Sequence, residues 1–293
     1  MAGKARLDAL AIWLMLLLCS LWGVQQVASK VALSEEMPPF MQAVLRSMIA
    51  GPLLVLWLFA RRGWPGVRAL VARDGSLWSG LIFGVEFMAL FSGLRLTSAS
   101  RGVVLLFTGV FFTVVGAHVF VPGERLRPVH VAGLGLAFLG VLATVGQRGG
   151  GGSVRGDALV LCAAAMWGAT SVLVKAHPAM GRIGSEKVLA YQLFGALPVL
   201  ALAALVAGEF RMPNASGLAW ASLAYQGAVI AFASYLTWFW LIARYPAGRL
   251  SAFTFLSPPF GILAAWGLLH EVPTALLGVG VLLICAGLWL VNR

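Results

Sequence analysis

Apolar stretches of about 20 residues recur along the whole chain, separated by short breaks rich in Pro, Gly or charged residues. A helix of about 20 apolar residues crosses a hydrocarbon layer of roughly 30 Å. The pattern therefore predicts an all-α membrane protein with ten transmembrane helices. The expected spans are residues 9–32, 39–59, 78–94, 102–121, 129–145, 158–175, 188–207, 219–242, 250–269 and 274–291.

The composition agrees with this pattern. The chain is 60% hydrophobic and 11% charged, and its mean hydropathy is +0.92, whereas soluble domains have about 25% charged residues. A soluble protein with so few polar residues could not cover its surface with them. The basic start, with Lys4 and Arg6 before an apolar stretch, resembles a signal peptide, but the length of that stretch predicts a retained helix.

The two halves of the chain repeat the same features at a separation of about 145 residues, which identifies a repeated structural unit. The matched pairs are Trp22 and Trp167, Gly23 and Gly168, Lys30 and Lys175, Arg46 and Gln192, Pro52 and Pro198, Arg101 and Arg249, and Glu124 and Glu271. We expect two five-helix repeats, residues 1–146 and 158–293. A Gly-rich linker at residues 147–157, outside the cytoplasm, is expected to join them.

Five spans in each half predict that the halves cross the membrane in opposite orientations. With the N-terminus in the cytoplasm, 13 Lys and Arg residues lie in cytoplasmic segments and 5 on the opposite side. This bias predicts that both termini are cytoplasmic. Contact with anionic lipid then accounts for the formal net charge of +11, so no nucleic-acid partner is expected.

Inverted repeats are typical of secondary transporters, whose substrate site lies at the repeat interface near the bilayer midplane. The repeat therefore predicts alternating access. A channel and an intramembrane enzyme are alternatives because fold alone does not set function. However, no span contains a re-entrant filter segment, and the one clear acid within a span, Glu86, has no His partner in the sequence.

Sequence motifs for cofactors and metals are absent. There is no Gly-x4-Gly-Lys-Ser/Thr motif for nucleotide phosphates. The four His residues lack paired ligand spacing, and the three Cys residues lie singly within spans. We therefore expect no cofactor, no metal site and no enzymatic activity.

The Trp-Gly-x6-Lys opening at Trp22, Arg46 in the second span, and Glu124 and Glu271 after the fourth and ninth spans resemble the EamA type of the drug/metabolite transporter superfamily. The resemblance covers essentially the whole chain and is greatest to bacterial exporters of aromatic amino acids. It implies a multi-pass protein of the bacterial inner membrane that exports neutral or aromatic amino acids and related metabolites. An exporter of cationic or lipophilic toxicants is the alternative.

Proline residues within spans are candidate hinges, since they free backbone carbonyls that only protein or water can satisfy. The candidates are Pro52, Pro198, Pro258 and Pro259. Ordinary kinks are the alternative. Members of the resembled family often carry Pro in both the fourth and ninth spans, but here the fourth has Thr108-Gly109. Proline therefore gives no reason to expect symmetric hinges.

Aromatic residues provide candidate walls for a substrate cavity. Trp22 and Trp167 lie near the middle of their spans, each followed by a Gly that permits close helix approach. Their faces suit an organic substrate and an ammonium group. Phe83 and Phe87 share a face of the third span with Glu86. Core or lipid packing is the alternative for all four aromatic residues.

Glu86 and Arg46 are the candidate charge partners of the substrate. A charged acid near mid-bilayer costs about 2.5–3.5 kcal/mol if it faces lipid. Glu86 would bind a substrate ammonium or take part in proton coupling, or else form a structural bond to Ser or Thr. Arg46 would hold a carboxylate, or else bind loop carbonyls or an outer acid. Gln192, which matches Arg46, and the adjacent Tyr191 are candidate hydrogen-bond donors.

The other charged residues of the repeat have structural interpretations. Lys30 and Lys175 lie near span ends and are expected to anchor at the membrane interface. Glu124 and Glu271 each precede a span and are expected to stabilise the N-terminus of that helix, with a gating role across the repeat as the alternative. The expected partners are a small-molecule substrate and the lipid bilayer, with a monomer as the expected state.

Overall fold

The computed structural model describes residues 8–71, 77–120, 127–146, 152–176, 184–242, 245 and 253–291, and every regular element within them is helical. The α-helices are α1 (Ala9–Ser34), α2 (Pro39–Val71), α3 (Leu77–Leu96), α4 (Ala99–Leu106), α5 (Gly109–Phe120), α6 (Pro128–Gly146), α7 (Val154–Ala176), α8 (Ser185–Val206), α9 (Gly217–Ala224), α10 (Tyr235–Ile242), α12 (Ser257–Leu269) and α13 (Ala275–Val291). A π-helix η2 (Tyr225–Ser234) joins α9 to α10, and a 3-10 turn η3 (Thr254–Leu256) precedes α12. The expected all-α class is confirmed for this part of the chain.

Seven helical stretches are long and apolar enough to cross a membrane, and three shorter apolar helices accompany them. The long stretches are Ala9–Ser34, Pro39–Leu70, Trp78–Leu96, Ala99–Phe120, Val154–Leu173, Glu186–Val206 and Gly217–Trp238, and the shorter helices are Pro128–Thr144, Ser257–Leu269 and Ala275–Gly287. Each falls on one expected span. The count of ten crossings remains a prediction, because three of the helices are short.

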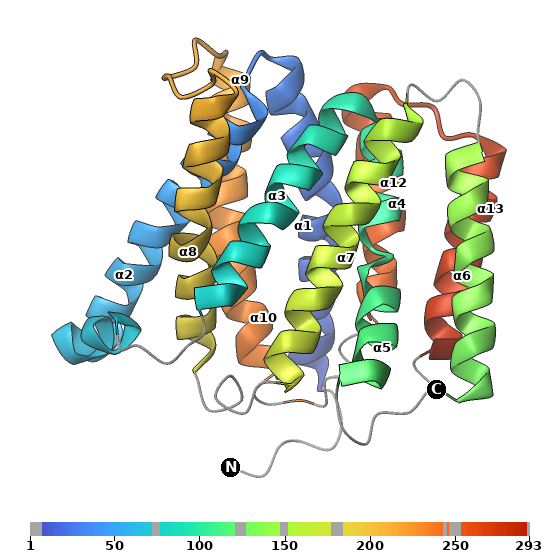
Figure 1. The fold of residues 1–293 in the computed structure, drawn as a ribbon, viewed down its shortest axis with the longest axis horizontal. Helices are drawn as coiled ribbons and strands as arrows, with labels where there is room; N and C mark the ends of the chain where they lie inside the picture. Colours follow the sequence, from blue (N-terminus) through green and yellow to red (C-terminus); the bar gives the residue numbers. More distant parts are fainter. Residues whose placement is uncertain are drawn as a thin grey trace.

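The two halves run in opposite senses through the bundle. In Figure 1, α1 begins at the lower end and runs upward, whereas α7, the first helix of the second half, begins at the upper end and runs downward. The start of α1 and the end of α13 lie at the same, lower end. Of the expected linker, residues 147–151 lie outside the described residues, and α7 already begins at Val154.

The first helix of each half packs closely on the broken helix of the other half. A Cβ at Gly23 of α1 would lie 2.6 Å from the carbonyl oxygen of Ser257, where α12 begins. A Cβ at Gly168 of α7 would lie 2.6 Å from the Cβ of Phe112 in α5. No larger residue fits these contacts without moving a helix. The expected close approach at both Trp-Gly pairs is therefore confirmed, and the halves exchange equivalent contacts.

The fourth and ninth expected spans are both interrupted, at positions that match in the repeat. Between α4 and α5, the Thr108 hydroxyl donates to the Leu105 carbonyl at 2.6 Å and closes a tight turn without proline. Pro258 and Pro259 do not interrupt α12 but lie in its first turn. Proline suits that position because a first-turn N–H has no partner within the helix. The break in the ninth span therefore precedes the two prolines.

The other candidate hinges lie within continuous helices. α2 and α8 continue through Pro52 and Pro198, and both proline side chains are exposed. The non-helical residue inside α2 is Gly63, with φ 61° and ψ −163°, a conformation that glycine adopts readily. The proposal that these prolines act as hinges stays a prediction.

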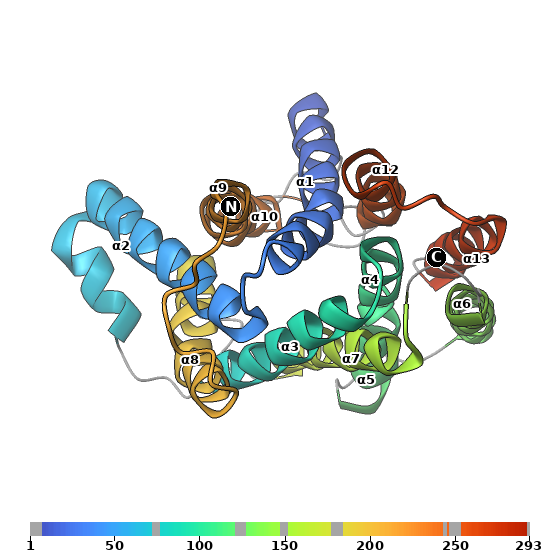
Figure 2. The same ribbon diagram turned by 90° about the horizontal axis from the view of Figure 1, so that it is seen from above.

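Helix α3 lies between the helices of both halves, as the view from above shows (Figure 2). Gly84 and Gly93 bring it against α8 and α7, since a Cβ at either position would lie within 2.9 Å of those helices. Phe83, Phe87 and Phe91 are buried and their rings follow one another, with centroids 4.6 and 5.7 Å apart. The expected aromatic face of the third span therefore points into the protein interior.

Replacing Gly23 or Gly168 with Ala should lower the melting temperature in detergent, because the added Cβ forces two helices apart at about 1–3 kcal/mol. Gly267→Ala is the matched control, since a Cβ there meets nothing within 4 Å. Equal melting temperatures for all three variants would contradict the close packing. Thermal unfolding followed by size-exclusion fluorescence is the measurement.

Candidate functional site

Polar side chains gather in the interior where α1, α2 and α3 of the first half meet η2 and α10 of the second. We call this group the central polar cluster, and its members are Gln26, Ser29, Gln42, Arg46, Glu86, Gln226 and Tyr235. All but the half-buried Tyr235 are at least nine-tenths buried. Buried polar groups in a membrane protein are uncommon and mark functional positions.

Arg46 is at the centre of this cluster and is 1% exposed. Its Nε donates to the Gln226 carbonyl at 3.4 Å, and its Nη2 donates to the Tyr235 hydroxyl at 3.3 Å. Its guanidinium carbon lies 4.2 Å from the centroid of the Phe87 ring, a cation–π arrangement. Both hydrogen-bond acceptors are neutral and belong to the second half, and the contacts of Arg46 in the described residues include neither a loop carbonyl nor an acid.

Glu86 lies beside this cation without forming a close ion pair. It precedes Phe87 on α3, is 7% exposed, and interacts electrostatically with Arg46. Its Oε2 has no hydrogen-bond partner in the described part of the chain. The structural alternative, a bond from Ser or Thr to this oxygen, is therefore not observed there. A guanidinium and a carboxyl group therefore lie in one buried region, and the carboxyl group has one oxygen without a partner among the described residues.

Three glutamines extend the cluster along α1, α2 and η2. Gln42 Nε2 donates to the Ser29 carbonyl at 3.3 Å, and Ser29 Oγ donates to Gln226 Oε1 at 3.1 Å. Gln26 lies one turn before Ser29 on the same face of α1. The sequence interpretation missed these residues, although an amide inside an apolar span is a recognisable signal, because such groups hydrogen-bond across helices.

The π-helix η2 positions the second half of the cluster. Gln226 lies in it and Tyr235 directly follows it, and both contact Arg46. A π-helix is rare and occurs frequently at functional sites. No local sequence signal predicts it, so its effect on the direction of these groups could not be expected in advance.

The predicted aromatic walls have different surroundings. Trp22 donates from Nε1 to Ser234 Oγ at 3.0 Å and packs edge-on against Trp238 at 5.3 Å. It therefore borders the central polar cluster, one turn from Gln26 on α1. Trp167 instead packs edge-on against Phe107, with centroids 5.7 Å apart. Both tryptophans also pack against the hydrophobic cluster that contains Phe107 and Phe111, and their predicted role as walls of a substrate cavity stays a prediction.

The remaining predicted residues are divided between the core and α8. Phe83 packs in the core beside Phe87, and only Phe87 contacts Arg46. Tyr191 is buried on α8 with the Lys187 amino group 5.7 Å from its ring centroid, and Gln192 is half-buried. The described contacts of Arg46 include neither residue, so their predicted role as hydrogen-bond donors stays a prediction.

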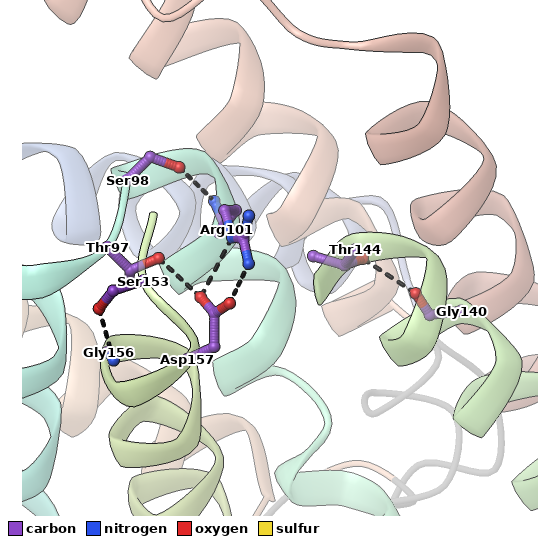
Figure 3. A network of polar contacts seen from close by, with 8 residues as sticks. All are labelled: Thr97, Ser98, Arg101, Gly140, Thr144, Ser153, Gly156 and Asp157. Atoms are coloured by element: carbon purple, nitrogen blue, oxygen red, sulfur yellow. Dashed lines mark hydrogen bonds and ion pairs between the residues drawn. The ribbon is translucent and has the colours of Figure 1, made fainter. Parts of the chain in front are cut away.

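A second polar group ties the halves together at the end of the bundle opposite the start of α1 and the end of α13 (Figure 1). Figure 3 shows both carboxylate oxygens of Asp157 facing the Arg101 guanidinium, with the Thr97 hydroxyl donating to Asp157 at 2.6 Å. Arg101 and Asp157 are 2% and 1% exposed. We call this group, with Lys30 and Glu271, the end network.

Lys30 and Glu271 have partners that the sequence did not predict. The Lys30 amino group donates to the Leu94 and Thr97 carbonyls at 2.6 and 2.8 Å, at the end of α3. Glu271 accepts from the backbone N–H groups at positions 99 and 100, at 2.8 and 2.9 Å. It therefore caps α4 of the other half. The expectation that its side chain stabilises the N-terminus of the following helix, α13, is wrong. Glu124 and the Lys175 side chain lie outside the described residues.

Comparison with known proteins gives a consistent result over the whole chain. The model of the EamA-like transporter family matches residues 9–146 and 154–293. A probable amino-acid metabolite efflux pump of Escherichia coli (strain K12) is 30% identical over 288 residues, covering 94% of this chain and 93% of the relative. A probable terminal-alkyne amino-acid exporter of Streptantibioticus cattleyicolor is 31% identical over 198 residues, 67% of this chain and 64% of the relative.

The fold is also similar to a solved crystal structure. That chain is 25% identical, superposes with a TM-score of 0.66, and the similarity covers 97% of this chain and 96% of the other. The expected resemblance is confirmed, and with it a multi-pass membrane protein whose relatives are transporters.

Replacing Asp157 with Asn should lower the free energy of unfolding by about 3–5 kcal/mol, because Arg101 stays buried without its carboxylate. The double variant Arg101→Gln/Asp157→Asn should recover part of that loss. Arg62→Gln is the control. Arg62 pairs with Glu186, but its side chain is 62% exposed, and exposed ion pairs contribute about 1 kcal/mol or less. The measurement is thermal unfolding. If the double variant loses as much stability as the two single variants added together, Arg101 and Asp157 are not directly coupled.

Proposed function

Because the chain belongs to the EamA-like transporter family, we propose that it is a secondary transporter that exports amino acids and related small metabolites from the cytoplasm. The proposal places it in a bacterial inner membrane, with ten crossings and both termini cytoplasmic. The names of two relatives, a probable amino-acid metabolite efflux pump and a probable terminal-alkyne amino-acid exporter, support this substrate class.

The observation that carries the proposal is the guanidinium of Arg46 and the carboxyl group of Glu86, which are buried together in the central polar cluster. An amino acid carries a carboxylate and an ammonium on one carbon. Arg46 forms two long hydrogen bonds to neutral acceptors, and a guanidinium has further N–H donors for a carboxylate. Glu86 Oε2 has no partner within the described chain and suits the ammonium. Phe87, which contacts Arg46, provides an apolar surface beside both charges.

The two repeats would supply the motion. Under this proposal, residues 1–146 and 158–293 rock about the central polar cluster, whose members come from both halves. The end network then closes the extracytoplasmic end, because Arg101 and Asp157, and likewise Glu271 and α4, join the two halves there. Opening that end requires these contacts to separate, whereas the Gly23 and Gly168 contacts remain as pivots.

Arg46→Gln and Glu86→Gln should each raise the half-saturating amino-acid concentration by about 10- to 100-fold, since each removes a charged hydrogen bond of about 1.5–3 kcal/mol. The measurement is counterflow in proteoliposomes with a panel of labelled amino acids, with and without a pH gradient. Arg46→Lys should be more active than Arg46→Gln, because lysine keeps the positive charge but lacks the planar guanidinium that binds a carboxylate through two hydrogen bonds.

Arg61→Gln, at an exposed position on α2, is the control and should transport normally. Amino-acid counterflow unchanged in both test variants would refute the assignment of these charges. Transport of lipophilic cations that needs Glu86 but tolerates Arg46→Gln would instead favour the alternative, an exporter of cationic toxicants.

A further inference from the structure

We propose that Gln26, Gln42 and Gln226, held together by Ser29, form an amide subsite beside Arg46 that binds a primary carboxamide on the side chain of the transported amino acid. The proposal rests on the proposed amino-acid transport and specifies its substrate class. The preferred substrates are amino acids of the glutamine and asparagine type, and aromatic side chains are disfavoured.

The Ser29 carbonyl fixes the orientation of the Gln42 side chain, and the Ser29 hydroxyl bonds to the Gln226 side chain. The Ser29 carbonyl can only accept a hydrogen bond, so the amide nitrogen of Gln42, 3.3 Å away, must face it. The Ser29 hydroxyl, in turn, bonds to Gln226 Oε1 at 3.1 Å. All three side chains are 1% exposed or less. These amide groups are buried and held by hydrogen bonds within the protein, unlike polar side chains at a protein surface.

Each glutamine of this region keeps one polar atom without a partner in the described part of the chain. These atoms are two acceptors, Gln42 Oε1 and Gln26 Oε1, and one donor, Gln226 Nε2. Buried polar atoms are nearly always hydrogen-bonded in native proteins. A primary carboxamide supplies two N–H donors and one carbonyl acceptor, which is the complementary set.

The position of the subsite fits a side chain rather than a second ligand. Gln42 lies four residues before Arg46 on α2, one turn or about 6 Å along the helix. Gln226 bonds Arg46 through its backbone carbonyl at 3.4 Å. An amino acid whose carboxylate lies on Arg46 therefore reaches the subsite with a short side chain. An apolar side chain of that length would bury the three unpaired atoms without partners, which strongly disfavours its binding.

The test is competition for labelled L-glutamine counterflow in proteoliposomes, with the unmodified protein. Unlabelled glutamine and asparagine should compete at least about tenfold better than norleucine, an apolar analogue of similar length, or than phenylalanine. Equal or better competition by norleucine or phenylalanine would overturn the amide subsite. In that case intact amino-acid transport that still depends on Arg46 would leave the proposed function standing.

Variants then locate the preference. Gln42→Leu and Gln226→Leu should each reduce the glutamine-over-norleucine ratio by about tenfold or more, because each removes one partner of the carboxamide. Gln25→Leu is the matched control, since Gln25 is a buried glutamine on α1 that points about 100° away from Gln26. A ratio that stays unchanged in folded Gln42 and Gln226 variants would show that water alone satisfies these atoms and would refute the subsite.

If a variant fails to fold, the competition series with the unmodified protein still decides the proposal. Absence of counterflow for every amino acid would refute the proposed function and the subsite together. Counterflow of other amino acids without glutamine would refute the subsite alone.

Discussion

A guanidinium that cannot lose its proton, buried inside a membrane-spanning helix, is the constraint on which this structure depends. Lipid cannot solvate Arg46, so the protein must do so. The groups that contact it are the Phe87 ring from α3, the Gln226 carbonyl from η2 and the Tyr235 hydroxyl from α10. Because these groups come from both halves of the chain, solvating one charge brings the repeats together around a polar centre.

The rest of the interface is built from close backbone contact rather than from charge. In lipid there is little hydrophobic drive between helices, so small residues that allow tight packing become decisive. Gly23 and Gly168 provide such contacts at equivalent places in the two repeats. The buried pair of Arg101 and Asp157 closes the bundle at one end. In the proposed alternating access, the close glycine contacts would act as pivots and the buried ion pair would separate when that end opens.

The sequence predicted the helices well because lipid forces every backbone group into internal hydrogen bonds. α1 begins at Ala9 and α13 ends at Val291, as expected from the apolar pattern alone. The matched Trp-Gly pairs also predicted where helices approach closely. The two tryptophans, however, have unlike neighbours. Repeated sequence predicts equivalent backbone positions, but each side chain contacts residues of the other half, and those residues differ.

The partners of charged groups could not be predicted, since they depend on packing between distant segments. Glu271 caps a helix of the opposite half, 172 residues away in sequence, although a helix start follows it directly. The π-helix that presents Gln226 to Arg46 leaves no trace in the apolar pattern. Local propensity cannot identify a contact whose geometry is set by helices from another repeat.

The central claim is that Arg46 and Glu86 together hold the charged groups of an amino acid between the two repeats. A structure of the protein determined by electron cryomicroscopy with a transported amino acid bound tests it most directly. The account predicts the carboxylate within hydrogen-bonding distance of Arg46 and the ammonium beside Glu86. An amino acid bound away from both residues, with Arg46 and Glu86 paired to each other, would contradict it.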